Sequence, residues 1–191
     1  MLIISILYKR GALQKVFCNF ESLKYVALSS ICEVKKGFQL SKVNMIPNGN
    51  YYVLNGGVSP SGYTDSFNCQ ENTISISEGG NSCGFVNFNI DKFWSGGHCY
   101  TLENVSGINL KYLYQYLKFQ EPNIMALRVG SGLPNIQKST IEKFQILLLP
   151  DDTQKTIGNS FFKIDKNIFL QERKLEMMQQ FKRSLLQKMF I

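Results

Sequence analysis

The chain has 191 residues, enough for one well-buried core with an appendage and too few for two domains of typical size. Its 44% apolar and 18% charged residues exclude a disordered chain, and five scattered cysteines without a C-x-x-C pair do not form a disulfide framework. The net charge of +7 lies mostly at the two ends, because residues 21–150 carry ten basic and nine acidic side chains. We therefore expect a folded cytoplasmic protein with reduced thiols, which would hold any nucleic acid through a few placed side chains or jointly with a basic partner.

The N-terminal segment, residues 1–20, opens with an apolar run followed by basic residues. This order is the reverse of a secretory signal, and the run is far shorter than the roughly 20 residues of a membrane span. Ten of its residues, YKRGALQKVF from Tyr8 to Phe17, recur near the C-terminus as FKRSLLQKMF, from Phe181 to Phe190. The recurrence predicts that residues 1–20 are the tail of a repeated helix, in a repeat of about 170 residues.

Residues 21–150 are dense in β-branched and aromatic residues separated by Gly, Asn and Ser, which predicts short strands. The candidate strands are residues 25–34, 51–55, 72–77, 83–89, 98–103 and 144–150, with turns at NGGVSPSGYTD, SEGGNS and WSGG. One helix is expected to interrupt them and to pack on the sheet. Its apolar face is predicted from the spacing of Leu110, Leu113, Tyr114 and Leu117.

Residues 151–191 change to a helical pattern after Pro150. Asp151 is expected to cap the helix, and Gln154 to reach back as in a capping box. An apolar stripe without proline then predicts a helix roughly 50 to 55 Å long, which a body of this size cannot cover alone. We expect a second helix to cover it in a dimer, with Gln171 as a polar break that fixes register. The alternative is a surface helix folded back on its own body. The stripe residues assigned to dimerisation are Ile157, Phe161, Ile164, Ile168, Leu175, Met178, Phe181, Leu185 and Met189.

Catalytic motifs are weak in this sequence. His98, the only histidine, precedes Cys99, but neighbours along a strand point to opposite faces, so packing is favoured over a nucleophilic pair. The glycines of SEGGNSCG lack the G-K-[ST] and G-x-G-x-x-G patterns of phosphate-binding loops. The sequence also lacks the Asn/Asp-Pro-Pro-aromatic motif of adenine methyltransferases.

A family resemblance joins these segments. The stretch from VGSGLPN to LLQKMF, residues 129–190, with LSSICEVKKGFQLSK at residues 28–42, resembles the specificity (S) subunit of type I restriction-modification systems. The shared series is a Gly/Ser/Asn loop, a hydrophobic strand ending at Pro150 with Gln154 soon after, and a helix ending in Lys-Arg and Leu-Leu-Gln-Lys-Met-Phe. Such subunits carry two target-recognition domains, each followed by a long spacer helix, and each domain reads half of a split DNA sequence.

The resemblance implies an α/β (α+β) fold: a β-rich target-recognition domain at residues 21–150, then a spacer helix at 151–191 that forms an antiparallel coiled coil in a dimer. One recognition domain indicates a half-size subunit or a fragment, working as a homodimer or beside another half-size subunit. The implied partners are double-stranded DNA and a methyltransferase subunit that holds S-adenosylmethionine, with a restriction subunit left open and no membrane. This chain is expected to be non-catalytic and to hold no metal or cofactor.

Recognition of DNA needs polar groups at base edges and cations at phosphates, and the loops supply both. For each candidate the alternative is an ordinary solvated turn residue or, for Trp94, a core aromatic. The candidate DNA-binding residues are Lys35, Lys36, Lys42, Asn55, Ser59, Ser61, Tyr63, Ser77, Asn81, Ser82, Trp94, Arg128, Ser131, Asn135, Gln137 and Lys138.

Two other interpretations stay open. The chain could be a recognition domain detached from a fused nuclease-methyltransferase, which acts without separate partners. It could also be a β-rich coiled-coil scaffold that binds no DNA.

Overall fold

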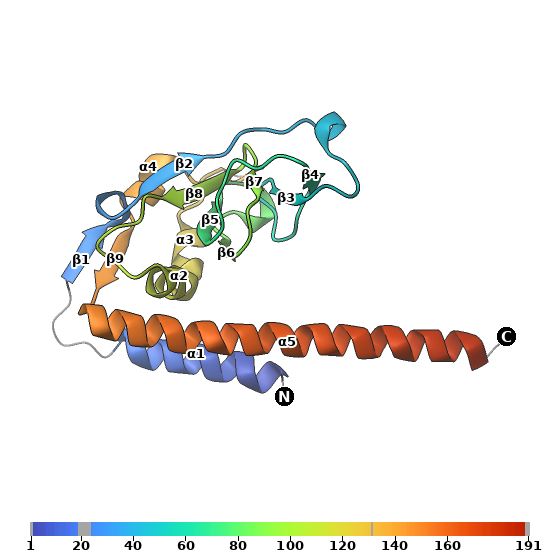
Figure 1. The fold of residues 1–191 in the computed structure, drawn as a ribbon. Coiled ribbons are helices and arrows are strands. Elements are labelled where there is room, and N and C mark those ends of the chain that lie inside the picture. Colours follow the sequence, from blue (N-terminus) through green and yellow to red (C-terminus); the bar gives the residue numbers. More distant parts are fainter. Residues whose placement is uncertain (1, 19–23, 131, 190–191) are drawn as a thin grey trace.

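The computed structural model describes residues 2–18, 24–130 and 132–189. Figure 1 shows a β-rich head over one end of a long helix, α5 (Asp151–Met189), which continues far beyond the head. A shorter helix, α1 (Leu2–Cys18), runs antiparallel along the first half of α5. The mixed α/β fold and the long C-terminal helix are confirmed.

In the described part of the chain, the strands of the head form three small sheets. The largest is antiparallel, in the order β2 (Glu33–Lys36), β8 (Cys99–Glu103), β5 (Thr73–Ser77) and β6 (Val86–Asn89). A second sheet has the order β4 (Gly62–Thr64), β3 (Tyr51–Leu54) and β7 (Trp94–Ser95). The third pairs β1 (Lys24–Ala27) with β9 (Gln145–Leu148), which joins the beginning of the head to its end.

The predicted strand at 25–34 is wrong as a single strand. A 3-10 turn at Leu28–Ser30 separates β1 from β2, and the backbone N–H of Leu28 donates to the Phe144 carbonyl over 2.9 Å. At this turn the chain leaves one sheet and enters another. The other five predicted strands each overlap an observed strand.

The prediction of one helix within the head is also wrong. The expected helix is α2 (Leu110–Phe119), but α3 (Glu121–Ala126) and α4 (Lys138–Glu142) follow it. Both are too short to show helical periodicity in the sequence. Helix α2 lies between the head's strands and α5, and it contacts α5, β6 and β9. It therefore packs against the long helix as well as against the sheets.

The start of α5 differs from the predicted capping box. The side-chain amide of Gln154 donates to the Leu149 carbonyl over 2.7 Å, and its oxygen accepts the N–H of Asn109 over 2.8 Å. Gln154 is therefore a buried clamp between the end of β9, the start of α2 and the first turn of α5. This contact gives a structural reason for a Gln soon after Pro150.

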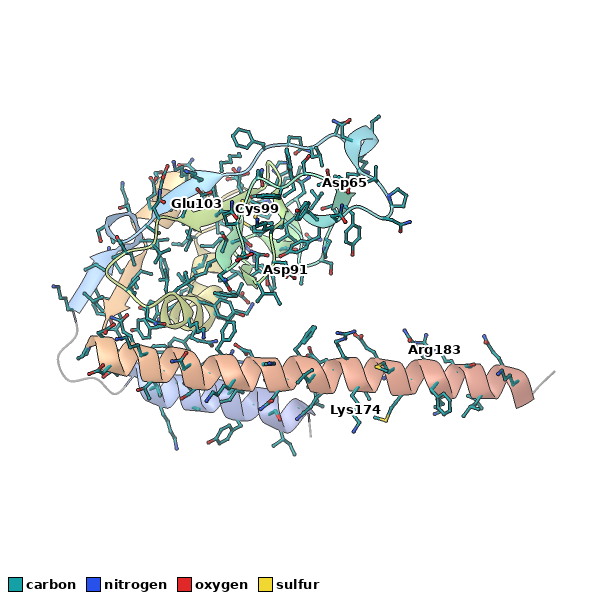
Figure 2. The ribbon with its side chains drawn as sticks, in the orientation of Figure 1. Asp65, Asp91, Cys99, Glu103, Lys174 and Arg183 are labelled. Carbon is teal, nitrogen blue, oxygen red and sulfur yellow. The ribbon has the colours of Figure 1, made fainter. Side chains whose placement is uncertain are left out.

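Four of the five cysteines, Cys32, Cys69, Cys83 and Cys99, are buried free thiols. Cys99 lies inside the head (Figure 2), in a small core cluster with Leu54, Cys69 and Phe93. Burial raises the pKa of the Cys99 thiol. His98 is exposed, so the two neighbours do not form a nucleophilic pair.

Helix α5 passes very close to the start of α2. A Cβ added at Gly158 would lie 2.7 Å from the Tyr112 nitrogen and 2.9 Å from Asn109 Oδ1, the atom that caps α2. We expect Gly158→Ala to destabilise the protein by about 1–3 kcal/mol, because two helices must separate. A thermal melt should show a midpoint several degrees lower.

Gly11→Ala in α1 is the matched control, because no atom lies within 4 Å of its added Cβ. There, Ala should stabilise the helix by about 0.5–1 kcal/mol. Equal midpoints for the two variants would contradict the close packing at Gly158.

Within residues 2–18, 24–130 and 132–189, none of the helices combines the length and the apolar character that a membrane span requires.

Candidate nucleic-acid interface

One edge of the largest sheet gathers residues from distant parts of the sequence. Because neighbouring strands are antiparallel, the end of β2 at Lys36, the residue after β5 at Glu78 and the residue before β8 at His98 meet at this edge. The loop before α4 reaches the same edge, where Asn135 bridges Gly79. Together they surround a cavity of about 420 Å³, which we name the head hollow. It is lined by Lys36, Asn55, Glu78, Gly79, Gly80, His98, Leu133, Pro134 and Asn135.

Glu78 organises the polar groups of the head hollow. Its Oε1 atom accepts from Lys36 Nζ over 2.6 Å and lies 3.0 Å from the Tyr100 hydroxyl. Its Oε2 atom is 3.6 Å from His98 Nδ1. Burial, and then the hydrogen bond to Glu78, raise the pKa of Tyr100. The Glu78 side chain is only 13% exposed, whereas the Lys36 and His98 side chains beside it are 51% and 64% exposed.

The backbone around Glu78 fixes its place. Its N–H donates to the His98 carbonyl over 3.0 Å, and its carbonyl accepts the N–H of Ile136 over 2.8 Å. Gly80 has φ of 73° and donates to the Pro134 carbonyl over 2.9 Å. The glycines therefore let the loop approach the segment before α4 closely.

The head hollow combines the group types that read base edges. Carboxylate oxygens accept from the amino group of cytosine, amide side chains suit adenine, and an ammonium suits guanine or phosphate. Lys36, Asn55 and Asn135 come from three separate candidate groups of the sequence, and the fold brings them together. Asn55 Oδ1 also accepts the backbone N–H of His98 over 3.3 Å.

Glu78 and His98 were not predicted from the sequence as parts of this site. Glu78 lies within SEGGNS, directly after the buried strand β5. A charged residue directly after a buried strand could have indicated a functional position. His98 was considered only as a partner for Cys99. Its exposed ring instead borders the head hollow.

Two candidate residues, Ser77 and Lys35, do not line the head hollow and already have partners elsewhere. Ser77 is 4% exposed and its hydroxyl donates to the Gly56 carbonyl, so we remove it from the set. Lys35 is half-exposed, but its ammonium is 2.7 Å from Glu103 Oε2 and 3.5 Å from Glu33 Oε2, on the opposite strand face from Lys36.

Five further candidates are associated with the second sheet and do not line the head hollow. Ser59, Ser61 and Tyr63 belong to the β3–β4 hairpin and are exposed, as is Lys42 in a 3-10 turn. The Trp94 indole N–H donates to the Phe38 carbonyl over 2.8 Å, so this polar edge is already engaged. Phe38 itself is 70% exposed, an aromatic surface that the sequence analysis did not single out.

The remaining candidates flank the head hollow in the sequence. Asn81 and Ser82 belong to the 3-10 turn Gly80–Ser82. Arg128, Gln137 and Lys138 are exposed on either side of Asn135, and Ser131 lies outside the described residues. Among the described residues, no group of three or more His, Cys, Asp or Glu side chains is placed to hold a metal ion.

The apolar stripe of α5 divides into two parts. Ile157 and Phe161 are 7% and 6% exposed in the chain's own core, and Ile164 packs against that core. We remove Ile157 and Phe161 from the dimerisation set, because α1 and the head cover this half of the helix. Ile168 is partly buried at the boundary, and the side chain of Met189 lies outside the described residues.

Beyond the head, the apolar stripe of α5 is exposed to solvent. Figure 2 labels Lys174 and Arg183 on this projecting part of α5, which we name the distal rod, residues 169–189. Its large apolar side chains are 42% to 66% exposed. They are Phe169, Leu170, Leu175, Met177, Met178, Phe181, Leu185 and Leu186.

The structure thus places a polar hollow on a β-rich head that is carried near one end of a long helix. Residues 21–180 match the family described as "Type I restriction modification DNA specificity domain". The chain belongs to this family.

Two curated relatives carry the name of type I specificity subunit. The one from Mycoplasma pneumoniae is 38% identical over 144 residues, which are 74% of this chain and 38% of that protein. The one from Mycoplasma genitalium is 35% identical over 144 residues, 74% of this chain and 37% of that protein. The chain thus spans well under half the length of these relatives.

Solved structures agree with this assignment. The crystal structure of the type I S subunit from M. genitalium has a TM-score of 0.72 and 34% identity, covering 78% of this chain and 40% of that one. The HsdS subunit from Thermoanaerobacter tengcongensis has a TM-score of 0.65 at 18% identity, covering 91% of this chain and 46% of that one. The latter shares the fold.

Proposed function

We propose that this chain is a non-catalytic DNA-recognition subunit that reads one half of a bipartite target. The observation that carries the proposal is the head hollow: Lys36, Glu78, His98 and Asn135 meet at one sheet edge of a specificity-domain chain. The rod would hold two such heads at a set separation, either in a homodimer or beside another half-size subunit.

The proposed reading step divides work between the hollow and its surroundings. The carboxylate, amide and ammonium groups of the hollow would meet base edges, and exposed cations such as Arg128 and Lys42 would meet phosphates. Methyl transfer would take place on a separate methyltransferase subunit that holds S-adenosylmethionine. The absence of an Asn/Asp-Pro-Pro-aromatic motif in this sequence supports that division.

Arg128 and Lys35 provide a matched test of the phosphate contacts. Arg128 is exposed, and no ion pair is seen for it in the described part of the chain, whereas Lys35 already faces Glu103 and Glu33. We expect Arg128→Ala to lower the slope of log affinity against log salt by about one, through the loss of one phosphate contact. Lys35→Ala should leave that slope unchanged, and the reverse pattern would contradict the proposed face.

The isolated chain is expected to bind DNA weakly, because residues 21–150 have nearly balanced charge and phosphate neutralisation supplies most non-specific affinity. Co-expression with the neighbouring reading frames should bring in a methyltransferase subunit, and the two chains should give one gel-filtration peak that binds more tightly and with a steeper salt dependence. A lone peak with no DNA binding would favour the scaffold interpretation. Tight, salt-insensitive binding by the lone chain would contradict the proposed dependence on a partner.

A further inference from the structure

Lys36 is held at both its backbone and its tip on the wall of the head hollow. The residue after it, Gly37, donates its N–H to the Cys99 carbonyl over 2.9 Å. A Cβ added at Gly37 would overlap the Gly96 carbonyl, so the backbone is tightly packed where β2 ends. The Lys36 ammonium in turn is 2.6 Å from Glu78 Oε1. This ammonium therefore has a defined position although the side chain is 51% exposed.

Glu78 is itself held from below. The Tyr100 hydroxyl lies 3.0 Å from Glu78 Oε1 and 3.1 Å from the Ile136 carbonyl, and Tyr100 is only 2% exposed. In the pairing of β2 with β8, Tyr100 stands directly opposite Lys36. The second carboxylate oxygen, Oε2, is buried and accepts no hydrogen bond from the described residues, and His98 Nδ1 is 3.6 Å from it. Glu78 can therefore act on a ligand through the ammonium that it holds.

The Lys36 ammonium keeps donors for a ligand. An ammonium has three N–H donors, and in the described part of the chain Glu78 engages one of them. Lys35, the preceding residue, differs because its ammonium lies 2.7 Å from Glu103 Oε2 and 3.5 Å from Glu33 Oε2. Two donors of Lys36 thus remain at the wall of the head hollow, which Lys36 lines.

Guanine is the base that matches two donors on one ammonium. Its major-groove edge carries two neighbouring acceptors, N7 and O6. Adenine has an amino donor beside N7, thymine has a methyl group beside O4, and cytosine presents an amino donor. Two adjacent donors in a defined position therefore favour guanine over the other three bases.

A phosphate is the other acceptor that DNA offers, and the charge of this site disfavours it. Lys36 and Glu78 together carry no net charge, and the carboxylate would repel a phosphate placed against the ammonium. Contacts to the DNA backbone gain their energy from cations that neutralise phosphates. The uncharged edge of guanine offers acceptors without this repulsion.

We propose that Lys36 reads a guanine of the half-site through N7 and O6, and that Glu78 is the positioning residue that holds the Lys36 ammonium for this contact. The inference rests on the proposed DNA-reading function and names the base that this part of the head hollow selects. Because the ammonium is already held in the free protein, the contact costs little further side-chain entropy. One G·C pair of the half-site should therefore depend on both residues.

Base preference in the complex of the full chain with a type I methyltransferase subunit tests this contact. The target is first mapped by sequencing of methylated bases, and equilibrium competition then compares duplexes that differ from it at one base pair. A good bidentate contact gives a preference of about 5- to 150-fold. We expect Lys36→Met to lose this preference at one G·C pair and to retain it at every other position. Lys36→Arg should keep the guanine, because arginine also donates to N7 and O6.

A double-mutant comparison tests the positioning role of Glu78. Glu78→Gln should weaken the preference at the same base pair, by less than Lys36→Met, because a neutral amide oxygen holds the ammonium less strongly. Adding Glu78→Gln to Lys36→Met should cause no further loss, since Glu78 acts through Lys36. A purely structural role would add a further loss and spread it over all positions. Lys35→Met is the matched control and should change no base preference.

A substitute variant covers the case in which Glu78→Gln gives no cooperative thermal melt. Glu78→Asp keeps the charge but withdraws the carboxylate from Lys36 by one methylene group. The preference at the same G·C pair should again weaken, with no further loss when Lys36→Met is added. An unchanged preference in a folded Glu78 variant overturns the positioning role.

Three results for Lys36→Met would overturn the guanine contact and leave the proposed function standing. They are an unchanged set of preferences, an altered pair other than G·C, and an equal loss of affinity for all duplexes with a salt slope smaller by about one. The last is the signature of a phosphate contact. A complex of the unaltered chain without any base preference would instead overturn the proposed function, and this inference with it.

Discussion

Phe181→Asp together with Leu185→Asp is expected to convert self-associated chains into monomers. Both side chains belong to the distal rod and are 66% and 45% exposed in the single chain. An unpaired charge buried in a helix interface costs several kcal/mol. We expect the association constant to fall by about 1,000-fold or more, which is about 4 kcal/mol.

Light scattering over a range of concentrations measures this change directly. Val43→Asp is the matched control, because Val43 is a 90% exposed apolar residue on the head, away from the rod. It should leave the mass unchanged. A dimer mass retained by the double variant would refute pairing through the distal rod.

The structure explains why these positions are preferred to the middle of the stripe. Charges at Ile164 and Ile168 were the natural choice from the sequence pattern alone. Ile164, however, packs against the chain's own core, so a charge there would disturb the head as well as any dimer. Charges placed on the distal rod should disturb the dimer without disturbing the head.

Deletion of seven residues from the rod, 171–177, is expected to shorten the gap between half-sites by about three base pairs. Seven residues are two helical turns and about 10.5 Å of rise, and they nearly preserve the phase of the stripe. Because the head hollow lies on the head, the bases read in each half-site should stay the same. Methylation mapping with the deleted chain measures both quantities.

The control for this deletion replaces the same seven residues with seven helix-forming residues that keep Leu175 and the apolar stripe, and the gap should then be unchanged. A change in the bases read would mean that the helix takes part in recognition. An asymmetric site for the unaltered chain would mean that it pairs with a different half-size subunit and not with its own copy. A gap unaffected by the deletion would contradict the spacer role.

Elements with a long regular pattern were predictable. Helix α5 keeps its apolar spacing over 39 residues without proline. A pattern of this length indicates a helix even where a short stretch of it could also be a strand. Strands β4 and β7, with three and two residues, carry no such signal. The break at Leu28–Ser30 was hidden because no Gly or Pro marks it, and it arises where the chain changes sheets.

Predictions from local sequence patterns were wrong where a side chain contacts residues of other elements instead of its own segment. Gln154 was expected to cap its own helix, but Leu149 and Asn109 offer it better hydrogen bonds. Ser77 was expected on a loop surface, but every residue of β5 is buried, so its hydroxyl points into the protein. The contacts of Gln154 and of Ser77 both depend on which other elements of the fold lie beside them. The few residues around each position do not determine those neighbours.

Some residues of the candidate site could be predicted one by one from the sequence, but their proximity in space could not. Lys36, Asn55 and Asn135 each stood in a loop with the right chemistry. Their convergence follows from the strand order β2-β8-β5, which a single sequence does not reveal. Glu78 and His98 gained significance only when that order placed them beside Lys36.

The central claim is that this chain selects the DNA sequence at which a methyltransferase partner acts. Sequencing of methylated bases tests it most directly, in a host that carries this gene together with a type I methyltransferase gene and in the same host without this gene. We expect a methylated split palindrome, with several unread base pairs between its halves, that is present only with the gene. Identical methylation in both hosts, while the chain co-purifies with the methyltransferase, would contradict it.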